Sequence, residues 1–467
     1  MNHKSYLPAD SRAPVDEVLP GAQLTLLGLQ HVLVMYAGVV TAPLVIGGAL
    51  GLARQEIAFL ISAALFVAGL VSLIQTVGFR GFGIKLPVMM GVSFTGVGPM
   101  LAIGANPDLG LNGIYGSMLV AGLIGIFISP LMGRMLRFFP PVVMGTEILM
   151  VGLSLMTVSA NWAAGGIGNP EYGALRYIGI AFMVLLFILL VVKYARGLVA
   201  NMAVLMGIIF GLALSVFSGV GVGDWDTVRE APWIGLEVAI PFKAGVPRFD
   251  VWAITAMTIV MIVTFIESTG MFVAVGETVK RPVNKKSIVH GFRADGAGFV
   301  LGSVFNIFPY TSYAENIGLV SITGVRSRWV CAAAGGILIL LGLLPKMSAI
   351  VATVPYFVLG GAGTIMFGMI TASGIHMLSR VDFTTNRFNA YIVAISIAVG
   401  MLPVVAEDFF NAFPEQLAPL LHSPILLTAL TAIALNLFFN GASERNDYFA
   451  LSPKPGEAVA PSAASIE

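Results

Sequence analysis

The segment GSVFNIFPYTSYAENIGLVSITG, residues 302–324, is an apolar run interrupted at its centre by proline, hydroxyl-bearing and acidic residues. A second segment, GIKLPVMMGVSFTGVGPMLAIG at residues 83–104, has the same form. Each sequence predicts a short extended piece followed by a half-helix. Extended backbone cannot face lipid unpaired, so such a break must line a cavity or pair within the protein. The alternative is that both segments are ordinary kinked helices.

The composition places these segments in a membrane. Of the 467 residues, 57% are hydrophobic and 10% are charged, whereas an average soluble domain has roughly a quarter charged residues. The apolar residues gather in runs of about 20, the length that crosses a hydrocarbon core of roughly 30 Å. The polar residues 1–20 and 441–467 are expected to be cytoplasmic tails. The single cysteine, Cys331, excludes an internal disulfide.

Apolar windows between charged or Pro/Gly-rich breaks predict fourteen membrane spans. The first seven lie near residues 22–48, 55–77, 84–103, 112–132, 139–158, 175–193 and 198–219. A polar stretch that includes Asp224 and Pro247 follows. The second seven lie near residues 251–278, 289–306, 308–325, 328–344, 356–378, 388–404 and 424–440, and residues 345–355 are ambiguous.

The distribution of basic residues predicts the orientation, because Lys and Arg concentrate in cytoplasmic loops. With both termini inside, most of the 25 basic residues fall in inner loops, inner span ends or tails. The ones that remain outside are Arg54, Arg176, Arg229, Lys243, Arg248 and Lys346. The charge count therefore agrees with fourteen spans and two cytoplasmic ends.

The two broken segments occupy the third place in each half of this topology. Short Gly/Pro-interrupted segments at matching places in two halves are typical of inverted-repeat transporters, whose sites lie at the breaks. We therefore predict an all-α integral membrane protein with fourteen spans in two inverted repeats of seven. Its third and tenth spans are each a short strand plus a half-helix.

Four acidic residues fall inside predicted spans: Glu147, Glu267, Asp295 and Glu315. An ionisable group inside a membrane normally faces a polar cavity and marks a substrate or proton path. Glu267 suits proton coupling, because a carboxylate that accepts two N–H bonds from a heterocycle can also take up a proton. The alternative for Glu267, Asp295 and Glu315 is a structural acid bonded to a neighbouring helix. Glu147 has no evident partner in the sequence, and this favours a structural or interfacial role for it.

Further candidates lie in the first and third predicted spans. His31, in the first span, could shuttle protons or simply tie two helices together. Ser93, Phe94 and Thr95 lie at the break of the third span. Phe94 could stack on a flat ring while its backbone N–H holds a carbonyl oxygen, although a phenylalanine in a membrane more often only packs.

The sequence gives no support for an enzyme. It has no Cys/His or HExxH metal spacing, no phosphate-binding GxxxxGK[ST] loop and no GxSxG elbow between a strand and a helix. We expect no cofactor and no metal. The net charge of +1 does not suggest a nucleic-acid partner. A channel is a further alternative, but broken spans with acids at a closed midplane site suit alternating access better.

The motif Glu315-Asn316-Ile317-Gly318, followed by Thr323-Gly324, resembles the signature of the nucleobase–ascorbate transporters: an amide or acid, then NxG, then TG. The resemblance covers the chain apart from its tails and is nearest to the bacterial uric acid and xanthine permease branch. Its other matches are LGLQHVLVMYAG (27–38), WAAGGIGNPEYG (162–173), LGGAGTIMFGM (359–369) and TTNRFNAYIVAIS (384–396).

This resemblance implies proton-coupled uptake of an oxidised purine, urate or xanthine, by a homodimer in the bacterial inner membrane that moves in an elevator-like manner. It also implies a core domain from spans 1–4 and 8–11 and a gate domain from spans 5–7 and 12–14. The corresponding core ranges are 21–132 and 251–344, and the gate ranges are 133–222 and 345–440.

The resemblance also assigns roles to residues. Glu267 and Glu315 would bond the ring, and the backbone near Phe94 and Ala314 would complete the site. The supporting residues for affinity or coupling would be His31, Asp295 and Asn316, and the selectivity positions would be Ser93, Met271, Thr323 and Gly324.

One position leaves the substrate open. Purine carriers of this family carry Gln where this chain has Glu315, and Glu there resembles the uracil permeases. Uracil permeases have His one turn after the membrane Glu, whereas this chain has Met271. Uracil or another nucleobase is therefore the first alternative. An anion exchanger or sulfate-type carrier of similar architecture is the second, although its site should present positive charge and the cavity candidates here are acids and amides.

Overall fold

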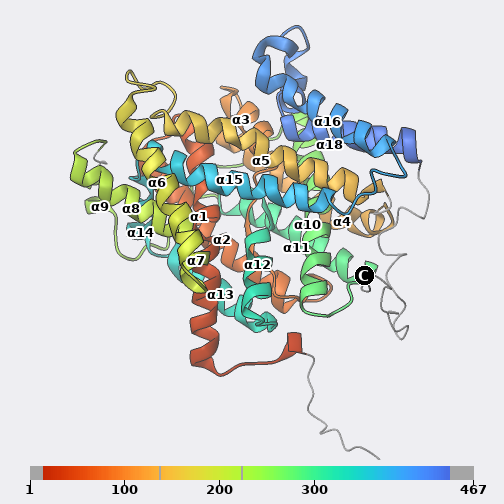
Figure 1. The fold of residues 1–467 in the computed structure, drawn as a ribbon, viewed down its shortest axis with the longest axis horizontal. Helices are drawn as coiled ribbons and strands as arrows, with labels where there is room; N and C mark the ends of the chain where they lie inside the picture. The colour runs from red at the N-terminus through yellow and green to blue at the C-terminus, as the bar shows by residue number, and fades with distance from the viewer. Residues whose placement is uncertain (1–13, 136–137, 222–224, 442–467) are drawn as a thin grey trace, which may run out of the picture.

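The computed structural model describes residues 14–135, 138–221 and 225–441 and is almost entirely helical (Figure 1). The predicted tails 1–20 and 441–467 lie mostly outside these residues. A short 3₁₀ turn, η1 (Pro14–Asp16), precedes the first long helix. The helices are apolar on most faces, because lipid rather than water surrounds the outer ones and other helices surround the inner ones.

The first half of the chain contains two long helices, a strand with a short helix, and a further group of helices. They are α1 (Gly21–Ala49), α2 (Arg54–Val77), β1 (Met90–Val92), α3 (Val97–Ala105), α4 (Gly110–Met135), α5 (Pro141–Ala163), α6 (Leu175–Tyr194), α7 (Leu198–Asn201) and α8 (Ala203–Ser218). A linker with α9 (Trp225–Glu230) and a 3₁₀ turn, η3 (Glu237–Ala239), leads to the second half.

The second half repeats this order. It contains α10 (Val251–Thr278), α11 (Lys285–Val304), β2 (Tyr310–Ser312), α12 (Ala314–Thr323), α13 (Arg328–Gly342), α14 (Pro345–Ala352), α15 (Tyr356–Leu378), α16 (Phe388–Val405), α17 (Ala418–Leu421) and α18 (Pro424–Asn440), with two 3₁₀ turns, η4 (Glu407–Phe410) and η5 (Glu415–Leu417), before α17. Each half therefore has a strand and a short helix in its third place, as the sequence predicts.

Within the described residues, eight single helices are long and apolar enough to cross a membrane: α1, α2, α4, α5, α6, α10, α15 and α16. Two bent pairs pass the same test together, α13 with α14 at 80° and the segment 415–421 with α18 at 75°. The ambiguous residues 345–355 thus form α14 beyond a sharp bend. The chain is a multi-pass membrane protein, and the number of fourteen spans stays a prediction.

The two breaks meet in the middle of the molecule. Strands β1 and β2 pair antiparallel, with Gly91 opposite Thr311. This pairing satisfies backbone groups that no helix could satisfy, which is the condition for irregular backbone at membrane depth. The backbone turns through the left-handed region just before each strand, at Lys85 (φ 61°) and Asn306 (φ 55°). The shared turn is a further mark of the repeat.

Helix packing follows the same symmetry. If each helix of one half is exchanged for its counterpart in the other, the contact of α2 with α13 becomes that of α11 with α4, and both are extensive. Likewise α1 with α13 matches α10 with α4, and α6 with α8 matches α16 with α18. Helices α5 and α15 are counterparts and pack most closely of all. The contacts therefore have the pattern of an inverted repeat.

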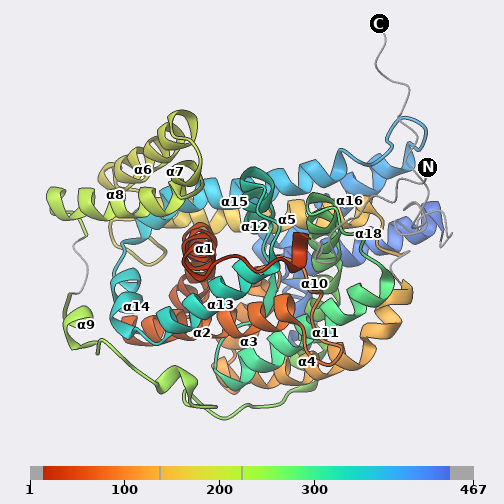
Figure 2. The same ribbon diagram turned by 90° about the horizontal axis from the view of Figure 1, so that it is seen from below.

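These contacts divide the described helices into two bodies. Helices α1–α4 and α10–α13 form the core body around the strand pair, and α5, α6, α8, α15, α16 and α18 form the gate body. Figure 2 shows α5 and α15 running along one side of the core helices, with α6 and α8 beyond one end and α16 and α18 beyond the other. The exposed apolar side chains of α6, such as Phe182 and Leu186, face outward. Helix α14 packs on α2.

Candidate functional site

Glu267 lies on α10 beside the strand pair and is partly buried. Its Oε2 atom accepts hydrogen bonds from the hydroxyls of Thr95 and Thr311, both at 3.2 Å. Thr95 follows β1 and Thr311 belongs to β2. One carboxylate oxygen is therefore held by a hydroxyl from each of the two breaks, so α10 and both repeats meet at Glu267.

Backbone hydrogen bonds fix the two breaks against each other. The Ser93 N–H donates to the Pro309 carbonyl at 2.7 Å, and the Tyr313 N–H donates to Met89 at 3.0 Å. The Tyr313 hydroxyl donates to the Val92 carbonyl at 2.9 Å, and its ring covers Gly91, where a Cβ atom would lie 2.2 Å from the ring. Only glycine fits at position 91.

Helix α12 begins at Ala314, next to this site, and Glu315 lies in its first turn. The N–H groups of a first helical turn have no partner in the helix and favour negative charge or a carbonyl oxygen. The side chain of Glu315 is exposed, and Gly318, one turn later, has open space where a Cβ would stand. Glu315 and Gly318 thus share an accessible face of α12, and Glu315 lies within electrostatic reach of Glu267.

His31 and Asn316 are buried partners. The His31 Nδ1 atom shares a hydrogen bond with Asn316 Oδ1, and Asn316 Nδ2 donates to the Pro87 carbonyl at 2.8 Å. Asn316 thereby connects α1, the chain before β1 and its own helix α12. The structure places His31 as a tie between helices, behind the site and not at its open face.

Asp295 on α11 is fully buried. Its Oδ1 atom accepts a hydrogen bond from Gln75 Nε2 at 3.1 Å, and Gln75 Oε1 accepts the N–H of Ile84 at 2.9 Å. The other oxygen faces the Ser268 hydroxyl of α10 without a hydrogen bond of normal geometry. Asp295 therefore supports α10 one residue beyond Glu267.

The site lies against the gate body. Phe94 makes an edge-to-face contact with Phe367 of α15, with ring centroids 5.8 Å apart. Met271 is one helical turn beyond Glu267 on α10 and is buried, and a Cβ on neighbouring Gly270 would lie 3.1 Å from the Met377 methyl group of α15. Phe94 and α10 thus form the core side of the boundary between the two bodies.

Not every predicted residue lies at Glu267. Ser93 lies close to it, because the Ser93 hydroxyl accepts the N–H of Thr95 at 3.3 Å and the Thr95 hydroxyl donates to Glu267. Thr323 and Gly324 stand at the other end of α12, about 13 Å along the helix from Ala314, and the Thr323 hydroxyl bonds the Leu319 carbonyl of its own helix. These two positions lie outside the immediate surroundings of the carboxylate.

Three residues at the site were not among the predicted ones: Thr311, Gln75 and Phe367. Thr311 stands in the second break as Thr95 stands near the first, so the inverted repeat is a signal that could have revealed it. Gln75 and Phe367 lie in apolar helices where a single polar or aromatic residue gives no such signal. Their contacts depend on packing between distant segments.

Glu147 lies on α5 of the gate body and is fully buried. Its negative charge would interact with that of Glu267. In the part of the chain that the structure describes, no group of three or more His, Cys, Asp or Glu side chains could hold a metal ion. The chemistry of the site is therefore that of carboxylates, hydroxyls and backbone N–H groups.

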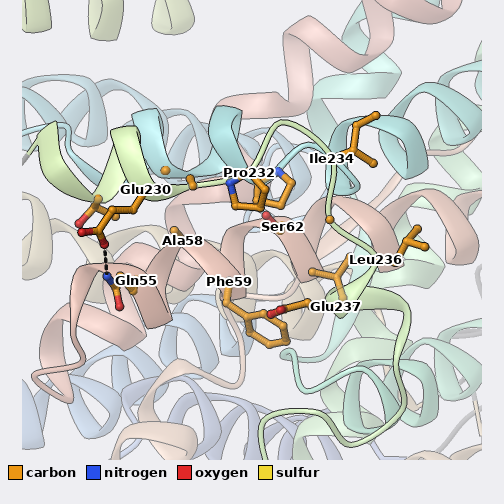
Figure 3. Close-up of a pocket in the computed structure, with 15 residues that line it drawn as sticks. Gln55, Ala58, Phe59, Ser62, Glu230, Pro232, Ile234, Leu236 and Glu237 are labelled. Carbon is orange, nitrogen blue, oxygen red and sulfur yellow. Dashed lines mark hydrogen bonds between the residues drawn. The ribbon is translucent and has the colours of Figure 1, made fainter.

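A separate cavity of about 570 Å³ lies at the start of α2 (Figure 3). Phe59 and Ser62 of α2 line it, together with the linker after α9 and the start of α14. Gln55 donates to Glu230 across its edge at 3.3 Å. Glu267 is not among its lining residues, so this cavity is distinct from the candidate site.

Two repeats whose broken spans meet at a partly buried carboxylate, between a core and a gate body, define a multi-pass membrane carrier. The chain belongs to the Permease family, whose family model matches residues 22–409.

Curated relatives cover nearly the whole chain. It is 52% identical over 435 residues to the uric acid transporter UacT of Escherichia coli (strain K12), covering 93% of this chain and 89% of that protein. It is 39% identical over 414 residues to the xanthine permease of Bacillus subtilis (strain 168), covering 89% of this chain and 93% of that protein.

A solved structure shares the fold. The transmembrane domain of the cyanobacterial bicarbonate transporter BicA aligns with a TM-score of 0.60, covering 90% of this chain and 99% of that domain, at 14% sequence identity. At this identity the likeness establishes the architecture of core and gate and not the substrate.

Proposed function

We propose that this chain is a permease that takes up an oxidised purine nucleobase, urate or xanthine, together with protons. The observation that carries the proposal is the Glu267 carboxylate, which both broken spans hold through Thr95 and Thr311. The names of the two curated relatives, a uric acid transporter and a xanthine permease, support the same substrate class.

The chemistry of the site suits a flat ring that carries both N–H groups and carbonyl oxygens. The carboxylates of Glu267 and Glu315 accept from ring N–H groups, and the first N–H groups of α12 donate to ring carbonyls. Phe94 offers an aromatic face or edge on the same side. An oxidised purine has all three features, since oxidation adds carbonyls to the ring and protons to its nitrogens.

Glu267 is the proposed proton-coupling residue. The hydrogen bonds from Thr95 and Thr311 support its ionised form, while the surrounding apolar helices support the neutral form. A change in the number of donors around the carboxylate, such as substrate arrival or movement of the core against the gate, shifts this balance. Substrate binding and proton binding are then linked in one side chain.

The proposal includes a bacterial inner membrane, two cytoplasmic termini and a homodimer whose core bodies move against the gates. Contacts among three residues that are predicted to lie inside, Asp16, Arg281 and Arg328, support this orientation. Asp16 accepts bonds from Arg328 at 2.7 Å and Arg281 at 3.3 Å. Arg328 also donates to the last carbonyls of α2, at Thr76 and Val77.

Two other substrates have observations in their favour. Glu315 favours uracil by its resemblance to the uracil permeases. An inorganic anion is the second alternative, because a bicarbonate transporter has the same fold, although that likeness does not determine the substrate. Against the anion, the charged groups that act on Glu267 among the described residues are the carboxylates of Glu315, Glu147 and Asp295. A small inorganic anion, which has no ring N–H group to donate to these carboxylates, would need positive charge in that place.

Uptake of radiolabelled xanthine into cells that express the chain tests the proposal. We expect uptake to rise at acid external pH, to collapse with a protonophore, and to be inhibited by excess unlabelled urate or xanthine more strongly than by uracil. Cells with the empty vector are the control. Uptake indifferent to the protonophore would remove proton coupling, and preferential inhibition by uracil or bicarbonate would replace the substrate.

A further inference from the structure

Glu147 is an acid that the proposed transport chemistry does not use. It lies on α5 and is fully buried. Neither of its carboxylate oxygens has a hydrogen-bond partner among the residues that the structure describes. An ionised carboxylate buried without donors costs several kcal/mol or more, so such a group normally becomes neutral or has a function.

The packing brings Glu147 to the level of Glu267 across the boundary between gate and core. On α5, a Cβ at Gly145 would lie 2.8 Å from the Leu378 side chain of α15. A Cβ at Gly270 of α10 would lie 3.1 Å from the methyl group of Met377, the preceding residue of α15. Helix α15 therefore touches α5 within two residues of Glu147 and touches α10 within three residues of Glu267.

Glu267 is the titratable group that faces Glu147. The two carboxylates repel each other when both are ionised, and α10 packs directly on α5. The other helices packed on α5 are α6, α15, α16 and α18. Helix α18 has no titratable residue. The titratable residues of the other three helices are exposed or stand in an end turn: Arg176, Tyr177, Lys193, Tyr194, Tyr356, His376 and Tyr391.

Two carboxylates that interact in an apolar region disfavour each other's ionisation, so the pair favours a single negative charge. Glu267 has two hydroxyl donors for that charge, whereas neither oxygen of Glu147 has a donor among the described residues. The proton of the pair therefore resides on Glu147 in this arrangement of the two bodies.

We propose that Glu147 is a second proton-binding residue of the transport cycle, which binds a proton when the core covers it and releases that proton to water when the core moves away. The inference rests on the proposed function, because the motion of the core against the gate is the transport step.

A linkage argument gives the expected effect. The arrangement that buries Glu147 binds one more proton than an arrangement in which water reaches its carboxylate. The ratio of the buried to the hydrated arrangement therefore rises with acidity, by up to about tenfold per pH unit for one proton. Glu147 makes the position of the core depend on pH independently of Glu267.

The test measures this ratio directly. Spin labels are placed on cysteines at Gly179 of α6 and Gly336 of α13, one in each body, because an added Cβ has open space at both positions. Cys331 is replaced by serine. Distance distributions are recorded between about pH 5 and pH 8 in the Glu267→Gln background, where the proton of Glu267 plays no part.

In that background we expect two distance populations whose ratio shifts at least several-fold with pH, and we expect the shift to vanish when Glu147→Gln is added. Glu147→Asp should keep a shift, and so should the matched control Thr146→Ala, whose hydroxyl donates to the Val142 carbonyl of its own helix. A pH response that survives Glu147→Gln, or no response in any variant, would overturn the inference.

The outcome is separate from that of the proposed function. The spin-labelled Glu267→Gln protein reports the motion of the core whether or not it transports a substrate. A failure of the parent chain to take up xanthine therefore does not decide whether Glu147 binds a proton. Infrared difference spectra supply a second readout, in which Glu147→Gln should remove a protonated-carboxyl band. Persistence of that band would also overturn the inference.

Discussion

Replacing Thr95 or Thr311 by valine removes one hydroxyl from the Glu267 carboxylate and keeps the volume of the side chain nearly unchanged. A hydrogen bond to a charged group contributes about 1.5–3 kcal/mol. The two bonds here are 3.2 Å long, which is longer than usual for O–H···O, so the lower value applies. A loss of about 1.5 kcal/mol corresponds to about a tenfold fall in transport kcat/KM.

The double variant gives a sharper expectation. Both hydroxyls donate to the same oxygen, Oε2, so the first replacement leaves one donor and the second leaves none. We expect transport kcat/KM of the double variant Thr95→Val with Thr311→Val to fall further than the product of the single effects, because the second replacement leaves a partly buried carboxylate oxygen without a hydroxyl donor and with an uncompensated desolvation cost.

The assay is initial-rate xanthine uptake, normalised to the amount of protein in the membrane. The matched control is Thr264→Val, which makes the same replacement on α10 one turn before Glu267, at a buried hydroxyl without a hydrogen-bond partner among the described residues. It should leave kcat/KM within about twofold. Equal losses of kcat/KM in Thr264→Val and Thr311→Val would refute the role of the two hydroxyls, and so would the absence of any loss in both Thr95→Val and Thr311→Val.

Two further predictions concern the acids and the strand pair. Glu267→Gln should abolish proton-driven uptake of xanthine, whereas Glu315→Gln should leave a carrier that still takes up xanthine. If the parent chain takes up uracil and the Glu315→Gln variant is inactive, the substrate assignment is reversed. Gly91→Ala should lower the free energy of unfolding by about 1–3 kcal/mol, because its Cβ would lie 2.2 Å from the Tyr313 ring. Thermal unfolding in detergent measures this change. The control Gly179→Ala on α6, where a Cβ meets nothing within 4 Å, should leave the free energy of unfolding unchanged. Equal stability of the two alanine variants would contradict the close packing of the breaks.

Much of the fold could be predicted from the sequence, because lipid imposes simple rules on it. Helices α10 and α15 begin and end at the residues predicted for two spans, 251–278 and 356–378. The broken segments became β1 with α3 and β2 with α12, since a proline and polar residues in an apolar run leave few other solutions. The bend after α13 was not predicted, because residues 345–355 are apolar enough to continue a span.

The site was harder to predict than the fold. Glu267 stood out because an acid in an apolar run needs an explanation. Its partner Thr311 did not, because threonine is common in membrane helices and strands, and only the register of β2 against β1 turns it toward α10. The position of Glu147 opposite Glu267 depends on how α5, α15 and α10 pack, which no local pattern records.

The central claim is that nucleobase and proton move together through Glu267. The most direct measurement is proton uptake into proteoliposomes of the purified chain on addition of xanthine or urate, recorded with an internal pH indicator. We predict an acidification that needs the substrate, is absent with Glu267→Gln and persists with Thr264→Val. Substrate entry without acidification, or equal acidification with Glu267→Gln, would contradict the account.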